Sequence, residues 1–373
     1  MLEVALLRPP GVLEGPSMAR YADRVRQHAA GDGVSVADMI VPVGGALRGA
    51  MAVHPRLGRL LLRELFWPAA VRRIARGIAA DVIHVPDHSF SSSLRCLPGK
   101  RTVVTCHDII PLETGMLRNP LEAGLYRANI RALRDAGRVI ADSRATMAGL
   151  ERRNLVAQAS VTVVPLGVDQ AFFSRPGGGE RQRTRSRLGL ADTGALLLHV
   201  SNLAPYKNVR GVVATFAAYR REHDPAARLA LAGPVDRRVR RIVRSAGVSG
   251  AVRALPPLSD QELAALYRSA DALLFPSLCE GFGLPVLEAM ASGLPVVVSN
   301  RGSLPEVVAD RVPRFDPGDH PGMCAELARL ASDGAYRAAL AAAGVEKARS
   351  FSWVRCGSAT AAVYHAIAQG GEH

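Results

Sequence analysis

The chain has 373 residues, of which 48% are apolar and 21% charged. That length exceeds one ordinary hydrophobic core and predicts two well-packed domains of similar size. The formal net charge of +14 first suggests a nucleic acid or another polyanion as partner. However, 44 of the 47 basic residues are arginines spread along the chain without a basic arm, which favours a small acidic substrate such as a nucleoside diphosphate.

Five cysteines are far apart and include no Cys-x-x-Cys pair, which predicts a reduced protein without structural zinc. The apolar run at the N-terminus is too short for a secretory signal and reads better as a first strand. No segment has the roughly eighteen consecutive apolar residues that a membrane-spanning helix needs. We therefore expect a cytoplasmic protein.

In the first half, apolar strand candidates alternate with helical patterns. The strands are expected at VALLRP, VSVADMIVPV, DVIHVP, RTVVTCHDII, GRVIADS and VTVVPLGVD, and the helices near 17–30, 56–79, 119–136 and 144–154. A second alternation follows, with strands at ALLLHVSN, ARLALAGP, VRALPP, DALLFPS and LPVVVS and helices near 207–222, 235–246, 259–270 and 284–292. Such alternation predicts an α/β fold with two doubly wound parallel sheets.

The segment between the two alternations, 174–187, loses its apolar content and contains three consecutive glycines. It predicts a flexible linker. The expected domains are thus 1–173 and 188–350, with a helical tail at 351–373. Two such domains, both Rossmann-like, would face a central cleft between the carboxyl ends of their sheets.

The stretch CEGFGLPVLEAMASGLPVVVS, at 279–299, carries the strongest chemical signal. It predicts a turn and a helix between two buried strands, with Pro285 at the helix start and Gly293 just past its end. The N–H groups of such a turn and the positive end of the helix dipole attract anions. Glu280 at the lip and Glu288 about one turn into the helix could accept hydrogen bonds from sugar and ribose hydroxyls. Glu288 alone would read as an acidic first turn, but the combination favours a ligand.

Lys207 lies where a predicted strand ends and a helix begins, in the segment SNLAPYKNV. An ammonium group there can face a diphosphate, whereas an unrelated surface lysine is the alternative interpretation. Together with a helix N-terminus it could stabilise a leaving diphosphate without a metal. No Asp-x-Asp motif occurs, so the usual carboxylate pair for a magnesium-bridged nucleotide sugar is missing.

His107 and Asp108 end a strand of the first domain, at the sheet edge that should face the cleft. A histidine there could bind a sugar hydroxyl or move a proton, and a capping or packing histidine is an equal alternative. The other nine histidines show no paired metal-ligand spacing, so no metal site is predicted.

The stretch 56–76 is basic and amphipathic, with Phe66 beside Trp67. Two interpretations stay open. One is a helix that packs its apolar stripe on the sheet and is broken at Pro68, which we favour; the other is peripheral contact with an anionic inner membrane surface.

Taken together, these residues resemble the retaining, nucleotide-sugar-dependent glycosyltransferases of family four (glycosyl transferases group 1), which have the GT-B fold. The match is dense over 258–317 and weaker at VSNLAPYKN, HDIIPL, VIADSRATMAGL, VTVVPLGVD and the closing FSW. The glutamate pair in this setting is highly specific, whereas His-Asp alone would not be.

The resemblance implies a role for each candidate residue. Glu280 would contact the transferred sugar, Glu288 the ribose, Lys207 the diphosphate, and His107 the sugar from the other domain. Backbone N–H groups of Gly281, Phe282, Gly283 and Leu284 would meet sugar and phosphate. The family retains the anomeric configuration, and its last helix crosses back to the first domain.

Three departures from the family pattern affect these roles. Ser201 and Asn202 stand where many relatives carry an arginine, so diphosphate binding would rest more on Lys207. Only Gly15 remains of an N-terminal glycine pair, which leaves the acceptor-side contacts of that loop open. Pro256 stands where relatives commonly have glycine.

The leading hypothesis is a metal-independent, retaining enzyme without a cofactor that moves a hexosyl or aminohexosyl group from a nucleoside diphosphate sugar to an acceptor hydroxyl. A nucleotide-sugar epimerase or a phosphorylase on the same fold is an alternative. A non-catalytic protein that binds nucleotide sugars or nucleic acid is another, motivated by the charge. The sequence leaves open the sugar, the base, the oligomeric state and whether the acceptor is a lipid, a polysaccharide or a small natural product.

Overall fold

A computed structural model describes residues 1–9, 11, 13–31, 33–41, 62–97, 101–117, 119–156, 160–174, 176–190 and 194–370. The chain forms two compact units. Unit 1 comprises Met1–Gly167 and Trp353–His373, and unit 2 comprises Val168–Ser352. Each unit has its own parallel sheet of six strands, which confirms the predicted α/β class with two doubly wound domains.

In unit 1 the strand order is β2-β1-β3-β4-β5-β6 and all pairings are parallel. The strands are β1 (Leu2–Arg8), β2 (Val34–Ile40), β3 (Val82–Val85), β4 (Thr102–Cys106), β5 (Arg138–Ala141) and β6 (Val161–Val163). The central strands β3 and β4 are buried on both faces, which is why they are mainly apolar without a polar–apolar alternation.

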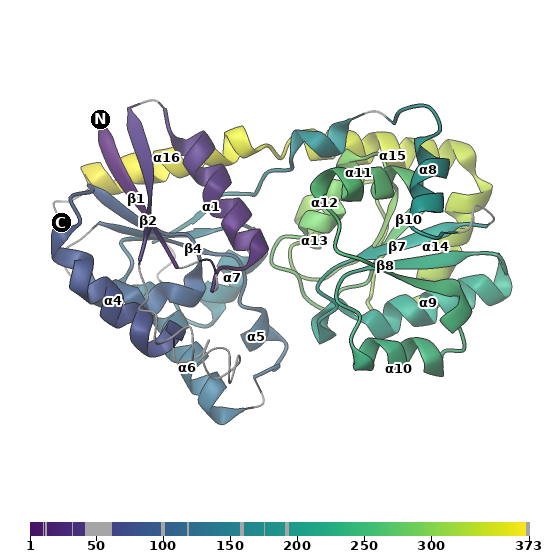
Figure 1. Ribbon diagram of the computed structural model, residues 1–373, viewed down its shortest axis with the longest axis horizontal. Coiled ribbons are helices and arrows are strands. Elements are labelled where there is room, and N and C mark those ends of the chain that lie inside the picture. The colour runs from purple at the N-terminus through teal and green to yellow at the C-terminus, as the bar shows by residue number, and fades with distance from the viewer. Residues whose placement is uncertain are drawn as a thin grey trace. The chain divides into compact units, whose positions relative to one another are not determined.

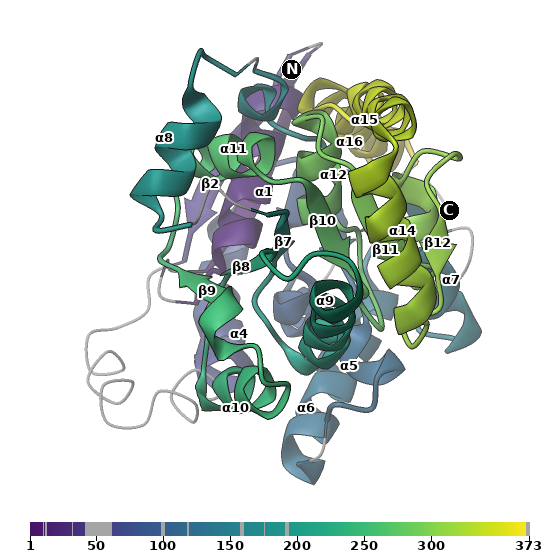
Figure 2. The same cartoon turned by 90° about the vertical axis from the view of Figure 1, so that its right-hand side faces the viewer.

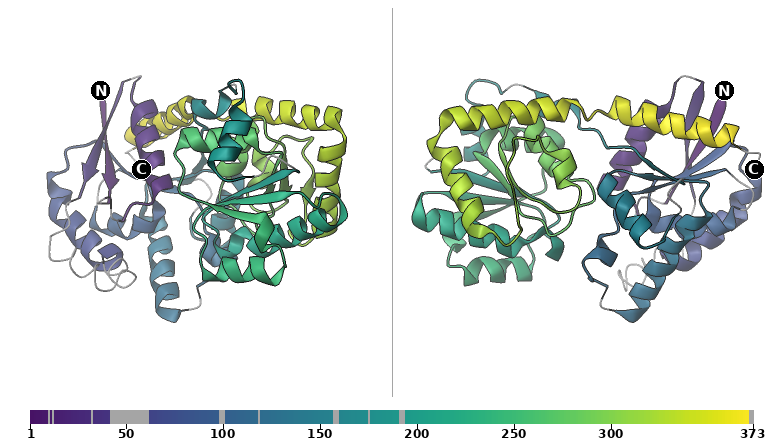
Figure 3. Two further views of the ribbon diagram at one scale, coloured as in Figure 1. Left: turned by 45° about the vertical axis from the view of Figure 1, so that its right-hand side comes forward. Right: turned by 180° about the vertical axis from the view of Figure 1, so that it is seen from behind.

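Helices cover both faces of this sheet (Figure 1). They are α1 (Pro16–Ala29), α4 (Trp67–Ile74), α5 (Ile110–Glu113), α6 (Pro120–Arg131), α7 (Arg144–Arg152) and α16 (Trp353–Gln369), with shorter turns η1 (Leu62–Phe66), η2 (Ala75–Gly77), η3 (His88–Cys96) and η4 (Ala132–Asp135). The closing helix α16 lies beside α1 (Figure 3). At their contact, a Cβ on Gly357 would lie 2.3 Å from the carbonyl carbon of His28, so only glycine allows this approach.

In unit 2 the strand order is β12-β11-β10-β7-β8-β9, again all parallel. The strands are β7 (Leu196–Val200), β8 (Arg228–Ala232), β9 (Val252–Leu255), β10 (Ala272–Phe275), β11 (Val296–Ser299) and β12 (Arg314–Phe315). The two-residue strand β12 was not predicted, because so short a run has no readable period.

The helices of unit 2 are α8 (Glu180–Arg187), α9 (Val209–Glu222), α10 (Arg237–Ser245), α11 (Asp260–Ser269), α12 (Leu284–Ala291), α13 (Leu304–Val307), α14 (His320–Ser332) and α15 (Gly334–Arg349), with short turns η6 (Gln170–Phe173), η7 (Pro205–Lys207) and η8 (Ser249–Ala251). Helices α9 and α10 lie on one face of the sheet and α11 and α12 on the other (Figure 1), and α9 packs beside α14 (Figure 2).

The segment predicted as a flexible linker, 174–187, contains helix α8. Its Arg185 is 1% exposed, and its guanidinium donates to the Ser269 carbonyl at 3.0 Å and pairs with Asp271 at 2.8 Å. Arg268 of α11 also pairs with Glu180. The linker expectation was wrong here, since these ion pairs hold a polar helix that hydrophobic patterning cannot reveal.

The basic stretch 56–76 is described from residue 62 onward, and 56–61 lie outside the described residues. Trp67 is fully buried with its ring 5.2 Å from that of Phe90, while the neighbouring Phe66 is 43% exposed. Pro68 stands in the first turn of α4 and does not break it. Within the described residues, we find no helix long and apolar enough to cross a membrane.

Candidate functional site

The strand order of unit 2 reverses direction between β7 and β10. In an open parallel sheet, the loops that follow two such neighbouring strands turn toward opposite faces of the sheet. They leave a crevice at the carboxyl ends of the two strands, and ligands bind in this crevice. The loop after β7 contains Lys207, and the loop after β10 contains Glu280. Both predicted residues therefore stand at the switch point of one sheet.

The loop after β10 is fixed by glycines and a serine. Gly283 precedes α12 with a φ of 102°, and a Cβ there would lie 2.9 Å from the Leu304 side chain. A Cβ on Gly302 would lie 2.3 Å from the Glu280 carbonyl oxygen. The Ser303 hydroxyl donates to the Phe282 carbonyl at 2.7 Å. Gly302 and Ser303 lie in the stretch of dense family resemblance, but local patterning gave no reason to single them out.

The loop after β7 is tied to the loop after β10 by Asn208. This residue adopts a left-handed conformation with φ 54°, and its side-chain amide donates to the carbonyls of Pro276 and Pro317 at 3.0 and 3.1 Å. Its side-chain oxygen also caps α9 at Gly211. One short polar side chain thus sets the distance between Lys207 and the strand that carries Glu280.

Lys207 and Glu280 form a direct ion pair. The ammonium nitrogen lies 2.6 Å from each carboxylate oxygen, and the two side chains are 12% and 3% exposed. The ammonium also lies 5.0 Å from the ring centre of Tyr206 and 5.5 Å from that of Phe275. The pair combines a partly buried cation and a buried hydrogen-bond acceptor next to the beginning of α12.

Glu288 is also buried, at 5% exposure, and accepts a hydrogen bond of 3.1 Å from the Tyr267 hydroxyl. It stands in the second turn of α12. A carboxylate has two oxygens and about four lone-pair sites, so it can accept more than one hydrogen bond. The assignment of Glu288 to ribose stays a prediction.

Ser201 and Asn202 bond within their own loop. The Ser201 hydroxyl contacts His199 Nε2 at 2.8 Å and accepts from the Leu203 N–H at 3.0 Å, and the Asn202 amide donates to the Tyr206 hydroxyl at 3.1 Å. Burial lowers the pKa of His199 to about 4, so this ring is neutral. Both residues shape the Lys207 loop, and their contact with a donor stays a prediction.

In unit 1, His107 is held on both ring nitrogens. Nε2 lies 2.9 Å from the Pro86 carbonyl and Nδ1 lies 3.2 Å from Asp142, while the ring meets that of Tyr21 edge-on at 4.7 Å. Burial lowers the pKa of His107, but the hydrogen bond and charge of Asp142 outweigh it and raise the pKa overall. Burial also raises the pKa of Asp142 to about 6. The pair therefore retains a proton near neutral pH.

Asp142 was not singled out from the sequence, although sheet register brings it to His107. Cys106 of β4 is paired with Ala141 of β5, so the residues that follow them are neighbours. The Asp108 carboxylate accepts from the Ile110 N–H at 3.0 Å. Gly15 is the N-cap of α1, and a Cβ added to it would meet no atom within 4 Å. The acceptor-side roles of Asp108 and Gly15 stay predictions.

A buried hydrogen-bond chain lies beneath His107. The Tyr364 hydroxyl of α16 contacts His84 Nδ1 at 2.7 Å, and His84 Nε2 contacts the Thr105 hydroxyl at 2.8 Å, which in turn meets the Tyr21 hydroxyl at 2.8 Å. Burial lowers the pKa of His84 to about 3, so its ring is neutral. Local sequence patterning carries no signal for this chain, because its directly bonded members are up to 280 residues apart.

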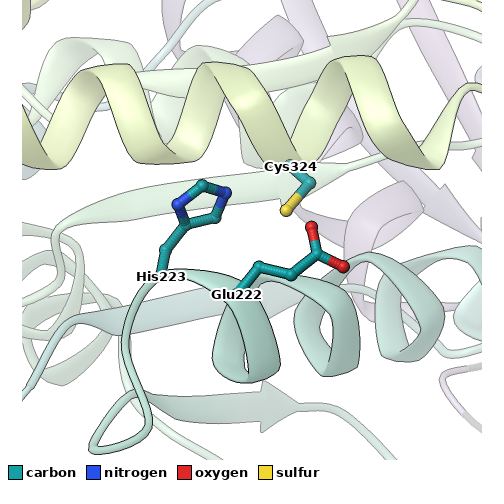
Figure 4. A group of neighbouring side chains, drawn as sticks. All are labelled: Glu222, His223 and Cys324. Atoms are coloured by element: carbon teal, nitrogen blue, oxygen red, sulfur yellow. The ribbon is translucent and has the colours of Figure 1, made fainter.

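One group of metal-ligand types occurs among the described residues. Glu222 and His223 at the end of α9 lie near Cys324 of α14, with their ligand atoms within 4.8 Å of one another (Figure 4). The Glu222 carboxylate pairs with Arg221, and burial raises the pKa of the Cys324 thiol. Helix α9 begins at the Lys207 loop and ends at the opposite edge of the sheet, so a metal there could not serve the switch point.

Two family models match the chain. Residues 18–172 match "Glycosyltransferase Family 4" and residues 180–347 match "Glycosyl transferases group 1". A D-inositol 3-phosphate glycosyltransferase from Salinispora arenicola is 37% identical over 247 residues, which are 62% of this chain and 55% of that protein. The O-antigen chain mannosyltransferase B of Escherichia coli is 35% identical over 170 residues, 45% of each chain. The chain thus spans about half the length of these relatives.

Solved structures share the fold. Sucrose-phosphate synthase from Thermosynechococcus elongatus superposes with a TM-score of 0.77 at 19% identity, covering 98% of this chain and 99% of that one. Anabaena HepE in complex with UDP and glucose gives 0.76 at 18% identity, covering 98% and 100%. At these identities the likeness shows the fold alone. With both family models matched in chain order, the protein belongs to the family-four glycosyltransferases and has their GT-B fold.

Proposed function

We propose that this protein transfers a hexosyl or aminohexosyl group from a nucleoside diphosphate sugar to an acceptor hydroxyl. The observation that carries the proposal is the largely buried Lys207–Glu280 pair at the switch point of unit 2. It supplies one cation for a diphosphate and one carboxylate for sugar hydroxyls. The relatives at 32–37% identity are named as glycosyltransferases, which supports the same class of reaction.

The donor would enter beside the ion pair. Its diphosphate would attract the Lys207 ammonium away from Glu280, and the freed carboxylate would then accept hydrogen bonds from the sugar. The N-terminus of α12 adds partial positive charge at the same place. Glu288, in the second turn of the same helix, would accept the ribose hydroxyls. HepE is described in complexes with UDP and with UDP-glucose, which supports a nucleotide-sugar donor here.

The reaction would retain the anomeric configuration. In same-face attack, the bond from the sugar C1 to the diphosphate oxygen breaks and a bond from C1 to the acceptor oxygen forms. The acceptor proton passes to the departing diphosphate oxygen, so atoms and charge balance without a protein base. Lys207 stabilises the charge that develops on the diphosphate, which is why the proposal assigns no step to a metal.

His107 would have a positioning and recognition role toward the sugar. Because Nδ1 is bound by Asp142, only Nε2 can exchange its Pro86 carbonyl for a sugar hydroxyl. A protonated ring would donate that hydrogen bond.

The test is product analysis with a panel of UDP, GDP, ADP and TDP sugars and hydroxyl acceptors. We expect release of the nucleoside diphosphate to depend on acceptor, and nuclear magnetic resonance of the product to show the donor's anomeric configuration. Glu280→Gln should abolish transfer and leave the circular dichroism spectrum unchanged. Full activity of that variant, an inverted product or an epimerised free donor would overturn the proposal.

A further inference from the structure

Unit 1 contains a pocket of about 590 Å³ next to His107. Its polar lining includes Asp87 and His88 after β3, Asp108 after β4, and Glu122 and Tyr126 on one face of α6. Leu13, Phe90 and other apolar residues complete the wall. The volume is sufficient for a ring-sized ligand.

Two buried polar atoms of this pocket have no hydrogen-bond partner in the described structure. They are His88 Nδ1 and the Tyr126 hydroxyl, on side chains of residues that are 6% and 9% exposed. The nearest carboxylate oxygen to His88 Nδ1, from Asp87, is 3.8 Å away and too far for a hydrogen bond. Buried polar groups are nearly always bonded, so these two atoms indicate a polar ligand.

The charged groups of the pocket are mainly acidic. They are Asp87, Asp108 and Glu122 against Arg63 and His107, and each of these two basic groups already has an acidic partner. Arg63 pairs with Glu64 at 2.7 Å, and His107 pairs with Asp142 at 3.2 Å. Burial lowers the pKa of His88, which keeps that ring neutral. Burial and then the charge of Asp108 raise the pKa of Tyr126, so its hydroxyl remains a donor. An anionic ligand in this pocket would be repelled by these three carboxylates.

We infer that this pocket binds the acceptor as a hydroxyl-rich ring without phosphate, neutral or bearing an amine, and discriminates against phosphorylated rings. This inference rests on the proposed transfer reaction, and it goes beyond it by naming the acceptor class. The Tyr126 hydroxyl and His88 Nδ1 bond the ring hydroxyls, and the carboxylates accept from hydroxyl or ammonium groups. Several matched relatives are named D-inositol 3-phosphate glycosyltransferases, and the acceptor class inferred here differs from the phosphorylated ring in that name.

The test measures binding of three rings of one shape by ligand-observed nuclear magnetic resonance at low salt. The probes are methyl glucoside, glucosamine and glucose 6-phosphate. We expect the first two to bind and the phosphate to bind at least about tenfold more weakly, as like-charge repulsion requires. Tyr126→Phe should weaken the binding of methyl glucoside, whereas Glu122→Gln should weaken the binding of glucosamine more than that of the other rings. Glu3→Gln, an exposed acid outside the pocket, should change nothing.

Tighter binding of glucose 6-phosphate, no binding of any probe, or binding unchanged by Tyr126→Phe would overturn the inference. Calorimetry with nucleoside diphosphates on the same protein separates this outcome from failure of the proposed function. If a nucleoside diphosphate binds but the pocket prefers glucose 6-phosphate, the inference about the pocket fails and the transferase proposal stands. If the unphosphorylated rings bind but no nucleoside diphosphate does, the transferase proposal fails and ring binding by the pocket stands.

Discussion

The ammonium of Lys207 lies 2.6 Å from both carboxylate oxygens of Glu280, although 73 positions separate the two residues in the chain. The contact joins the loops that follow two adjacent strands, β7 and β10, at the point where the strand order reverses. When no nucleotide sugar is bound, the ammonium and the carboxylate neutralise each other's charge. In the proposed reaction a diphosphate would compete for the same ammonium, so donor binding would be linked to release of the Glu280 carboxylate.

Breaking one side of this pair should destabilise unit 2. Lys207→Met leaves a carboxylate that is 3% exposed without its cation, and we expect the free energy of unfolding to fall by about 3 kcal/mol. The double variant Lys207→Met with Glu280→Gln should lose less than the sum of the single variants. Denaturant unfolding of the four proteins measures this coupling. Strictly additive losses would show that the pair does not act as a unit.

Glu288→Gln should raise the KM for the donor by about tenfold with a small effect on kcat, because a hydrogen bond from a hydroxyl to a charged group is lost. Tyr336 and Glu326 form a similar hydroxyl–carboxylate bond of 2.8 Å between α15 and α14. Glu326→Gln is therefore the matched control and should leave the KM unchanged. Equal effects of the two variants would remove Glu288 from the donor site.

Asp142→Asn should lower the pKa of His107 below its ordinary value of about 6.5, because burial, the largest influence, is then opposed only by the smaller effects of Asp87 and the Pro86 carbonyl. In the native protein both members of the pair have raised pKa values, so the folded state binds more protons than the unfolded state. Their stabilising contribution is present at low pH and is lost as pH rises through about 6 and the raised pKa of His107. Nuclear magnetic resonance titration of the imidazole and melting temperatures across this range test both statements; a pKa unchanged in the variant contradicts them.

Tyr364→Phe should lower the free energy of unfolding by about 1–3 kcal/mol, because His84 Nδ1 is left buried and unpaired. The double variant Tyr364→Phe with His84→Leu removes both partners, and its loss in free energy of unfolding should be smaller than the sum of the losses in the two single variants. Thermal unfolding provides the measurement. A silent Tyr364→Phe would mean that α16 is held by packing alone.

Chelation should leave transfer intact, since Lys207 and not a metal is assigned to the diphosphate. Cys324→Ser removes one of the three metal-ligand types at the far end of α9 and should leave activity unchanged as well. The measurement is the initial rate before and after exhaustive EDTA treatment. A rate that falls with EDTA and returns with magnesium would refute the metal-independent mechanism.

The two alternations of strand and helix were predictable from sequence because buried parallel strands appear as apolar runs between helical periods. Helix α8 was not, since Arg185, its buried anchor, is a charged residue that sequence reasoning places in solvent. The same holds for β12, whose two residues carry no period.

The site was predictable where one local motif contains the chemistry, as for Glu280 and Glu288 around the start of α12. Lys207 could be named from its position between a strand and a helix, but its direct contact with Glu280 required the strand order. The partnership of His107 with Asp142 required the register of β4 and β5, which a single sequence does not state.

The most direct test of the donor site is titration calorimetry of UDP, GDP, ADP and TDP with the native protein, Lys207→Ala and the surface control Arg240→Ala. We predict that at least one diphosphate binds the native protein and Arg240→Ala equally, and that Lys207→Ala binds it at least about tenfold more weakly, a difference of about 1.4 kcal/mol. Equal affinity for native protein and Lys207→Ala would contradict the account.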